Sequence, residues 1–251
     1  MYFKALVIGC LTGFISAFFG IGGSSIDTPL LRLFLNLPPY IALGTPLPLT
    51  LLTASIASLA YKREHLVNFR IALYSLVGGV PGMGVGSYLT TYLSGKFLMF
   101  FTAFILLFMG IDFLYNNVIE KIVRIKNISS PPAYYIISVG AFIGILSGIL
   151  ANGGGIFFVP AYVVSFRMKM KEAIATSLLT VAVMSVPGIL IHYHLGHINL
   201  PISAALGTGV APLAYLGARM DIKTKSKTIK LLFGIFLVTF SIYFLISQLS
   251  V

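Results

Sequence analysis

An internal repeat constrains this chain more than any other feature, because residues 131 positions apart match through most of its 251 residues. Matches of glycine and proline mark shared backbone requirements, whereas apolar matches arise between any two hydrophobic segments. The chain therefore contains two similar halves, which we place at residues 1–117 and 132–251 with a linker at 118–131. The matched pairs are Gly13 and Gly144, Ser16 and Ser147, Gly22 and Gly153, Gly23 and Gly154, Pro29 and Pro160, Thr45 and Thr176, Asn68 and Asn199, Gly78 and Gly209, Pro81 and Pro212, Gly86 and Gly217, and Lys96 and Lys227.

The composition predicts a membrane protein. Hydrophobic residues make up 58% of the chain and charged residues only 9%, which is too few charges to cover a water-soluble domain of this size. Charge-free runs supply six bilayer crossings and two shorter segments interrupted by glycine. The alternation of polar and apolar residues that a β-barrel requires is absent. We expect an all-α, multi-pass protein of the cell membrane with a single transmembrane domain and crossings at 40–60, 71–92, 97–116, 173–193, 201–218 and 231–249.

Charge and cysteine content argue against several other classes of protein. The formal net charge is +11, but the basic residues lie at the ends of hydrophobic runs, which disfavours nucleic acid as a partner. The single cysteine, Cys10, excludes an internal disulfide framework and a Cys-rich metal site. Neither glycine cluster continues into the Lys-Ser or Lys-Thr of a phosphate-binding loop. We therefore expect no cofactor, and we expect the lipid bilayer and a small anionic substrate as partners.

The basic residues of the two repeats lie in opposite connections, which predicts opposite orientations. The first repeat has Lys62, Arg63 and Arg70 after its 40–60 crossing, whereas the matching stretch at 194–200 has no Lys or Arg. If each repeat is a broken hairpin followed by three crossings, fourteen of the 17 Lys and Arg residues, including those of the linker, lie on the cytoplasmic side. Parallel repeats would split these residues ten to seven. The charges therefore favour two inverted-topology repeats, each a Gly-broken helical hairpin plus three transmembrane helices.

Two glycine-rich segments interrupt these hairpins and form the candidate substrate site. They occupy residues 19–29 and 151–160, and each ends in a proline. A helix that restarts after a break directs free N–H groups and its positive dipole end at the break, which suits an anion. The alternative is that the glycines only allow close helix packing, but their repetition in register favours a binding site. The candidate substrate-binding residues in the breaks are Gly22, Gly23, Ser24, Ser25, Asn152, Gly153, Gly154 and Gly155.

The duplicated element resembles that of the TauE/SafE-type sulfite and organosulfonate exporters, also called the TSUP family. The resemblance rests on Gly20-Ile-Gly-Gly-Ser up to Pro29, on Asn152-Gly-Gly-Gly up to Pro160, on the chain length and on a repeat that covers nearly the whole chain. It implies transport of small anions such as sulfite, sulfonates or related sulfur and carboxylate compounds. The first copy departs from the pattern, because Ser24 replaces the third glycine and Asp27 lies within the element.

Asp27 is the candidate coupling residue. It lies in an apolar segment, where a carboxylate is costly and usually functional. The other acidic residues lie in stretches that we assign to basic loops, apart from Asp112 near the end of a crossing; those in loops are Glu64, Glu120, Glu172 and Asp221. Asp27 either accepts a coupling proton or holds Arg32 in place, and the sequence leaves both roles open.

Hydroxyl and imidazole groups complete the set of candidates. Thr45, Thr176 and Ser177 begin the crossings that follow the breaks, and their hydroxyls either bind the anion or form hydrogen bonds between helices. Three histidines cluster at the end of the 173–193 crossing, but no acidic residue lies beside them, so we expect no metal site. These histidines are His192, His194 and His197.

These features favour a secondary transporter over a channel or an enzyme. Two facing breaks suit alternating access, and the resemblance implies an exporter of sulfite, a sulfonate or a related sulfur compound. A small-anion channel with a fixed filter formed by the paired half-helices is the alternative. An intramembrane enzyme is disfavoured, because the apolar segments lack a paired-carboxylate, Ser-His or metal-ligand constellation.

Overall fold

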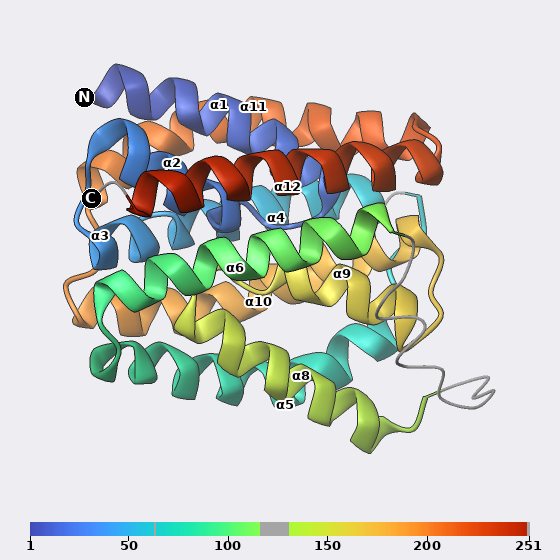
Figure 1. The fold of residues 1–251 in the computed structure, drawn as a ribbon. Helices are drawn as coiled ribbons and strands as arrows, with labels where there is room; N and C mark the ends of the chain where they lie inside the picture. The colour runs from blue at the N-terminus through green and yellow to red at the C-terminus, as the bar shows by residue number, and fades with distance from the viewer. Residues whose placement is uncertain (63, 116–130, 250–251) are drawn as a thin grey trace.

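The structure is a computed structural model that describes residues 1–62, 64–115 and 131–249, and within these ranges helix is the only regular structure. The helices lie side by side in a bundle (Figure 1). The expected linker at 118–131 falls outside the described residues except for its last position. The helices are α1 Tyr2–Phe19, α2 Ser24–Leu35, α3 Pro39–Gly44, α4 Leu47–Lys62, α5 Phe69–Leu89, the 3₁₀ turn η1 Thr90–Tyr92, α6 Gly95–Leu114, α8 Ala133–Ile149, α9 Gly155–Val164, α10 Met170–His194, α11 Leu200–Lys223 and α12 Ser226–Leu249.

Six stretches of described helix are long and apolar enough to cross a membrane: Tyr2–Phe19, Pro39–Lys62, Gly95–Asp112, Met170–His194, Leu200–Lys223 and Lys227–Gln248. Five of them coincide with expected crossings. The expected crossing at 71–92 coincides with α5, a helix of 21 residues that is not among these six. The sixth stretch is α1, which we had assigned to a broken hairpin. Five expected crossings therefore coincide with these apolar stretches, and the crossing at 71–92 stays a prediction.

The helices of the second half recur at the interval of the sequence repeat. Five helices begin 131 residues after a helix of the first half, at residues 2 and 133, 24 and 155, 39 and 170, 69 and 200, and 95 and 226. One pair differs, because α3 and α4 are separate helices whereas α10 is continuous. Pro46 lies between α3 and α4, and its position in α10 is taken by Ser177. In Figure 1, α1 and α8 begin at opposite ends of the bundle.

The most extensive helix contacts join the two halves: α1 packs against α11, and α5 packs against α8. Glycines allow these helices to approach closely. A Cβ on Gly86 of α5 would lie 2.1 Å from the carbonyl oxygen of Ile145, and one on Gly217 of α11 would lie 2.3 Å from that of Phe14. No side chain fits at such distances, so these helices approach backbone to backbone, as small residues commonly permit in membranes. Gly86 and Gly217 therefore serve the packing of helices across the two halves.

Candidate functional site

The first break in the helices lies between α1 and α2 at residues 20–23. Gly20, Gly22 and Gly23 have φ angles of 74°, 83° and 107°. Residues with a Cβ rarely adopt such angles, so glycine is what lets the chain turn here. Helical geometry resumes at Ser24.

The second break lies between α8 and α9 at residues 151–154. Ala151, Gly153 and Gly154 have φ angles of 47°, 68° and 93°. The side-chain Oδ1 of Asn152 accepts a hydrogen bond from the backbone N–H of Gly154 at 3.0 Å. This bond fixes the asparagine against the backbone just before α9 begins at Gly155.

The structure brings the two breaks into contact. A Cβ on Gly155 would lie 2.4 Å from the carbonyl oxygen of Ile21, so the backbones of the two breaks touch. Gly22 and Gly153, which match in the sequence repeat, face the same two residues of α4 and α10. These residues are Thr50 and Val181. Four segments that are far apart in the chain therefore meet at one place.

The carboxylate of Asp27 points towards the first break. Its Oδ2 lies 3.4 Å from the position that a Cβ on Gly23 would take, and the hydroxyl oxygens of Thr50 and Ser16 lie 3.7 and 3.8 Å from the same point. Asp27 is 1% exposed, and neither of its carboxylate oxygens has a hydrogen-bond partner among the described residues. A carboxylate and two hydroxyls therefore share a buried space beside the break.

The alternative role for Asp27, holding Arg32, is contradicted. The Nη1 of Arg32 donates a hydrogen bond to the carbonyl oxygen of Leu37 at 2.9 Å. The arginine side chain thus reaches the loop that follows α2, and no ion pair joins it to Asp27 in the described part of the chain.

The serines of the breaks differ in how their hydroxyls are used. The hydroxyls of Ser24 and Ser25 are buried and have no hydrogen-bond partner within the described ranges. The hydroxyl of Ser177 donates to the carbonyl oxygen of Gly20 at 3.3 Å, so this residue of α10 contacts the first break. The backbone N–H of Ser24 donates to Thr50 Oγ1 at 3.2 Å, which ties the start of α2 to α4.

Thr45 and Thr176 are engaged in contacts between the halves. Thr45 Oγ1 accepts a hydrogen bond from the backbone N–H of Asn199, and Thr176 Oγ1 accepts one from that of Asn68. The sequence leaves two roles open for these hydroxyls, anion binding and hydrogen bonding within the protein, and the structure shows the second. Contact of these threonines with a substrate stays a prediction.

A small cavity of about 10 Å³ adjoins the second break. Its size is close to that needed for one water molecule. It lies between α2, α6 and the start of α9, and the candidate residues Ser25 and Asn152 form part of its lining. The full lining is Ser25, Thr28, Thr102, Ile105, Leu106, Leu150, Asn152 and Ile156.

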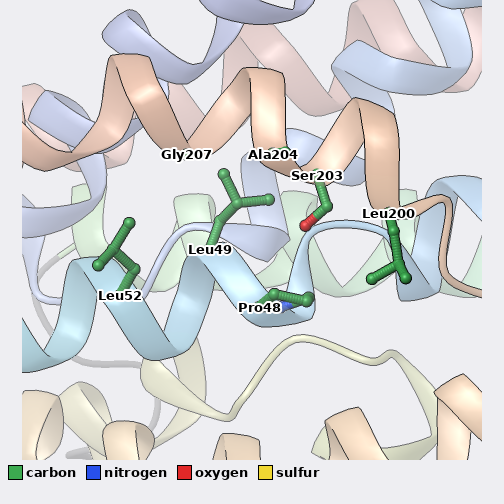
Figure 2. Close-up of a pocket in the computed structure, with 7 residues that line it drawn as sticks. All are labelled: Pro48, Leu49, Leu52, Leu200, Ser203, Ala204 and Gly207. Atoms are coloured by element: carbon green, nitrogen blue, oxygen red, sulfur yellow. The ribbon is translucent and has the colours of Figure 1, made fainter.

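A larger hollow of about 390 Å³ lies between α4 and α11 and contains none of the candidate residues (Figure 2). Its lining residues are Pro48, Leu49, Leu52, Leu200, Ser203, Ala204 and Gly207. Because Ser203 is the one residue among these with a polar side chain, the hollow suits an apolar group and not a small anion.

The histidine cluster forms a pair. His192 Nδ1 and His197 Nδ1 lie 3.0 Å apart, and the His197 ring stacks on Tyr40 at 5.1 Å between centroids. Burial lowers the pKa of His197. His194 is exposed, and no three His, Cys, Asp or Glu side chains in the described ranges are placed to hold a metal ion.

The expectation that Asp221 lies in a basic loop is wrong. It lies in α11 with 0% exposure, and its Oδ2 accepts a hydrogen bond from the Tyr61 hydroxyl at 2.5 Å. Asp221 has basic residues near it in the sequence, whereas its hydrogen-bond partner is a tyrosine 160 positions away. No local pattern in the sequence could have revealed this contact.

Sequence comparisons place the chain among membrane transporters. The chain is 30% identical over 255 residues to the probable membrane transporter protein YunE of Bacillus subtilis, with 93% of each chain covered. It is 26% identical over 217 residues to the probable membrane transporter protein YdhB of the same organism, covering 85% of this chain and 88% of YdhB. A probable membrane transporter protein of Methanocaldococcus jannaschii is 22% identical over 264 residues, covering 96% and 94%.

No solved structure matches the chain. The family model described as Sulfite exporter TauE/SafE matches residues 5–244, which is nearly the whole chain. Together with the six apolar helices, this match identifies a multi-pass membrane protein. The chain therefore belongs to the TauE/SafE sulfite exporter family, as its duplicated glycine-rich element predicts.

Proposed function

We propose that this protein is a secondary transporter that exports a small anion such as sulfite, a sulfonate or a related sulfur compound. The observation that carries the proposal is the direct contact between the two breaks, where Gly155 meets the Ile21 carbonyl. Backbone N–H groups at the starts of α2 and α9 suit an anion bound between them. The family description supports the substrate class, and the relatives, which are named as membrane transporter proteins, support transport.

The proposed mechanism is alternating access around the two breaks, within two repeats of opposite orientation. The repeats occupy residues 1–117 and 132–251, with the linker at 118–131 in the cytoplasm. The recurrence of helices at 131-residue intervals and the opposite ends at which α1 and α8 begin support this arrangement (Figure 1). Repeats related by an axis in the membrane plane exchange inward and outward states by rocking against each other.

In this proposal Asp27 carries the coupling proton. A carboxylate that is fully buried, with neither oxygen hydrogen-bonded among the described residues and no pairing to Arg32, is costly to keep charged. A change that opens this space to water would favour loss of the proton. Substrate contacts are assigned to Gly22, Gly23, Ser24 and Ser25 on one side, and to Asn152, Gly153, Gly154, Gly155 and Ser177 on the other.

The test is flux of sulfite, thiosulfate and a sulfonate in proteoliposomes that contain the purified full chain. A carrier gives flux that saturates with concentration, and an excess of unlabelled anion on the opposite side accelerates exchange of labelled anion. A channel gives flux without this counterflow, which would replace the transporter by the channel alternative. Protein-free liposomes and the Gly154→Val variant are the matched controls, and absence of flux with all three anions would contradict the proposed function.

A further inference from the structure

The small cavity beside the second break is lined in part by buried hydroxyl groups. The hydroxyls of Ser25 and Thr28 on α2 are 2% and 1% exposed by residue and have no hydrogen-bond partner among the described residues. A buried hydroxyl without a partner is costly, so two of them at one cavity favour the binding of a small polar group there. Water or a substrate oxygen would satisfy both.

Asn152 supplies a third hydrogen-bond donor to the same cavity. Its Oδ1 already accepts from the N–H of Gly154, which leaves its Nδ2 as the group available to a ligand. Thr102 also lines the cavity, but its hydroxyl donates to the Leu98 carbonyl at 2.8 Å. The available donors are therefore Ser25, Thr28 and Asn152.

The hydroxyl groups of this lining all come from the first half of the molecule. In the sequence repeat, the positions of Ser25 and Thr28 are taken by Ile156 and Val159. The position of Thr102 is taken by Phe233, whose ring stacks on Phe19 at 4.6 Å between centroids. Where the first half has hydroxyl groups, the second half thus has the apolar side chains of Ile156 and Val159 and a phenylalanine ring stacked on Phe19. The two breaks are therefore chemically unequal, although their backbones match.

We propose that this cavity is a subsite that binds one oxygen atom of the transported oxyanion through Ser25, Thr28 and Asn152. The assignment rests on the proposed transport function and deepens it. The three residues with available donors line a space of about the size of one water oxygen, and the cavity lining contains no carboxylate to repel an anion. The remainder of the anion lies between the starts of α2 and α9.

The subsite predicts how hydroxyl removal changes transport. Thr28→Val removes the hydroxyl at nearly constant volume and introduces the residue of the second half, while Ser25→Ala removes the other hydroxyl. Each change is expected to raise the KM for sulfite efflux from proteoliposomes about tenfold, the usual effect of losing one hydrogen bond to a charged group. Thr28→Ser keeps a hydroxyl and is expected to retain a KM near that of the unchanged protein.

Thr53→Val is the matched control. Thr53 on α4 is also buried and its hydroxyl also lacks a partner in the described part of the chain, but it does not line the cavity. Its removal is expected to leave the KM unchanged. Thermal stability of each purified variant, measured with and without sulfite, separates a folding defect from a binding defect, because a binding defect lowers only the shift that sulfite produces.

The outcomes distinguish this subsite from the function on which it rests. If Thr28→Val and Ser25→Ala keep the original KM while Gly154→Val abolishes flux, the protein is a transporter and the subsite is wrong. If Thr53→Val raises the KM as much as Thr28→Val, the effect is not specific to the cavity and the subsite is again overturned. If the unchanged protein moves none of the tested oxyanions, both proposals fail.

Discussion

The hydroxyl of Thr45 accepts a hydrogen bond from the backbone N–H of Asn199 at 3.0 Å, and the residues 131 positions away repeat this contact with the halves exchanged. There, Thr176 accepts from the N–H of Asn68 at 2.9 Å. Each asparagine then caps its own helix, since its side chain accepts from the N–H three residues later at 3.1 Å in both cases. Each half of the protein thus helps to fix the start of a helix in the other half.

This reciprocity predicts the effect of removing the hydroxyls. Thr45→Val and Thr176→Val each leave a backbone N–H without its acceptor and are expected to lower the free energy of unfolding by about 1 kcal/mol. Because the two contacts are separate, the double variant should show roughly the sum. Denaturation of the purified variants measures this. Unchanged stability together with a large loss of transport would instead place the two threonines at the substrate.

Glycine substitutions separate the breaks from the packing contacts. Gly23 has a φ of 107° but ordinary space around it, so Gly23→Val acts mainly by straining the backbone. At Gly154, a Cβ would also come within 2.7 Å of the Ser147 hydroxyl. Both variants are expected to reduce anion flux per folded protein at least tenfold. Normal flux in both folded variants would remove the breaks from the binding site.

Gly86→Ala and Gly217→Ala form the comparison set. Their new methyl groups meet carbonyl oxygens of Ile145 and Phe14, so the helices must separate. We expect lower thermal stability with near-normal flux in the protein that remains folded. Loss of flux without loss of stability in these variants would contradict the division between the two kinds of glycine.

Asp27→Asn tests proton coupling. The amide keeps the shape of the protonated carboxyl group but cannot release a proton. We expect substrate binding to persist, as measured by thermal stabilisation with sulfite, and the pH dependence of flux to disappear. Flux that keeps its pH dependence in this variant would reduce Asp27 to a structural role.

The sequence predicts the repeated plan of the protein better than its polar interior. Glycines at matched positions indicate where the backbone turns, because few other residues adopt φ angles such as that of Gly23. The sequence does not reveal that the Thr28 hydroxyl is buried without a partner among the described residues. A threonine in an apolar helix gives the same sequence pattern whether it faces lipid, another helix or a cavity. Asp221 shows the same limit, because its tyrosine partner comes from a distant helix.

Labelling tests the opposite orientation of the repeats. With Cys10 replaced by serine, Glu64→Cys and His194→Cys place single thiols at exposed positions at the ends of α4 and α10. If the repeats are inverted, a membrane-impermeant thiol reagent reaches the first from the cytoplasmic side and the second from the opposite side. Labelling of both from one side would contradict the inverted arrangement.

His197 predicts how stability depends on pH. Its pKa is lowered by burial, and its ring contacts His192 and Tyr40. The unfolded chain therefore takes up this proton at a higher pH than the folded protein does, so the stabilisation is complete above the ordinary histidine pKa of about 6.5 and declines as the pH falls below it. His197→Asn keeps a possible hydrogen bond to His192 without titrating. We expect the melting temperature of the unchanged protein to fall between pH 7.5 and 5.5 by about 2 °C more than that of the variant. Equal falls in the two proteins would show that His197 does not set this dependence.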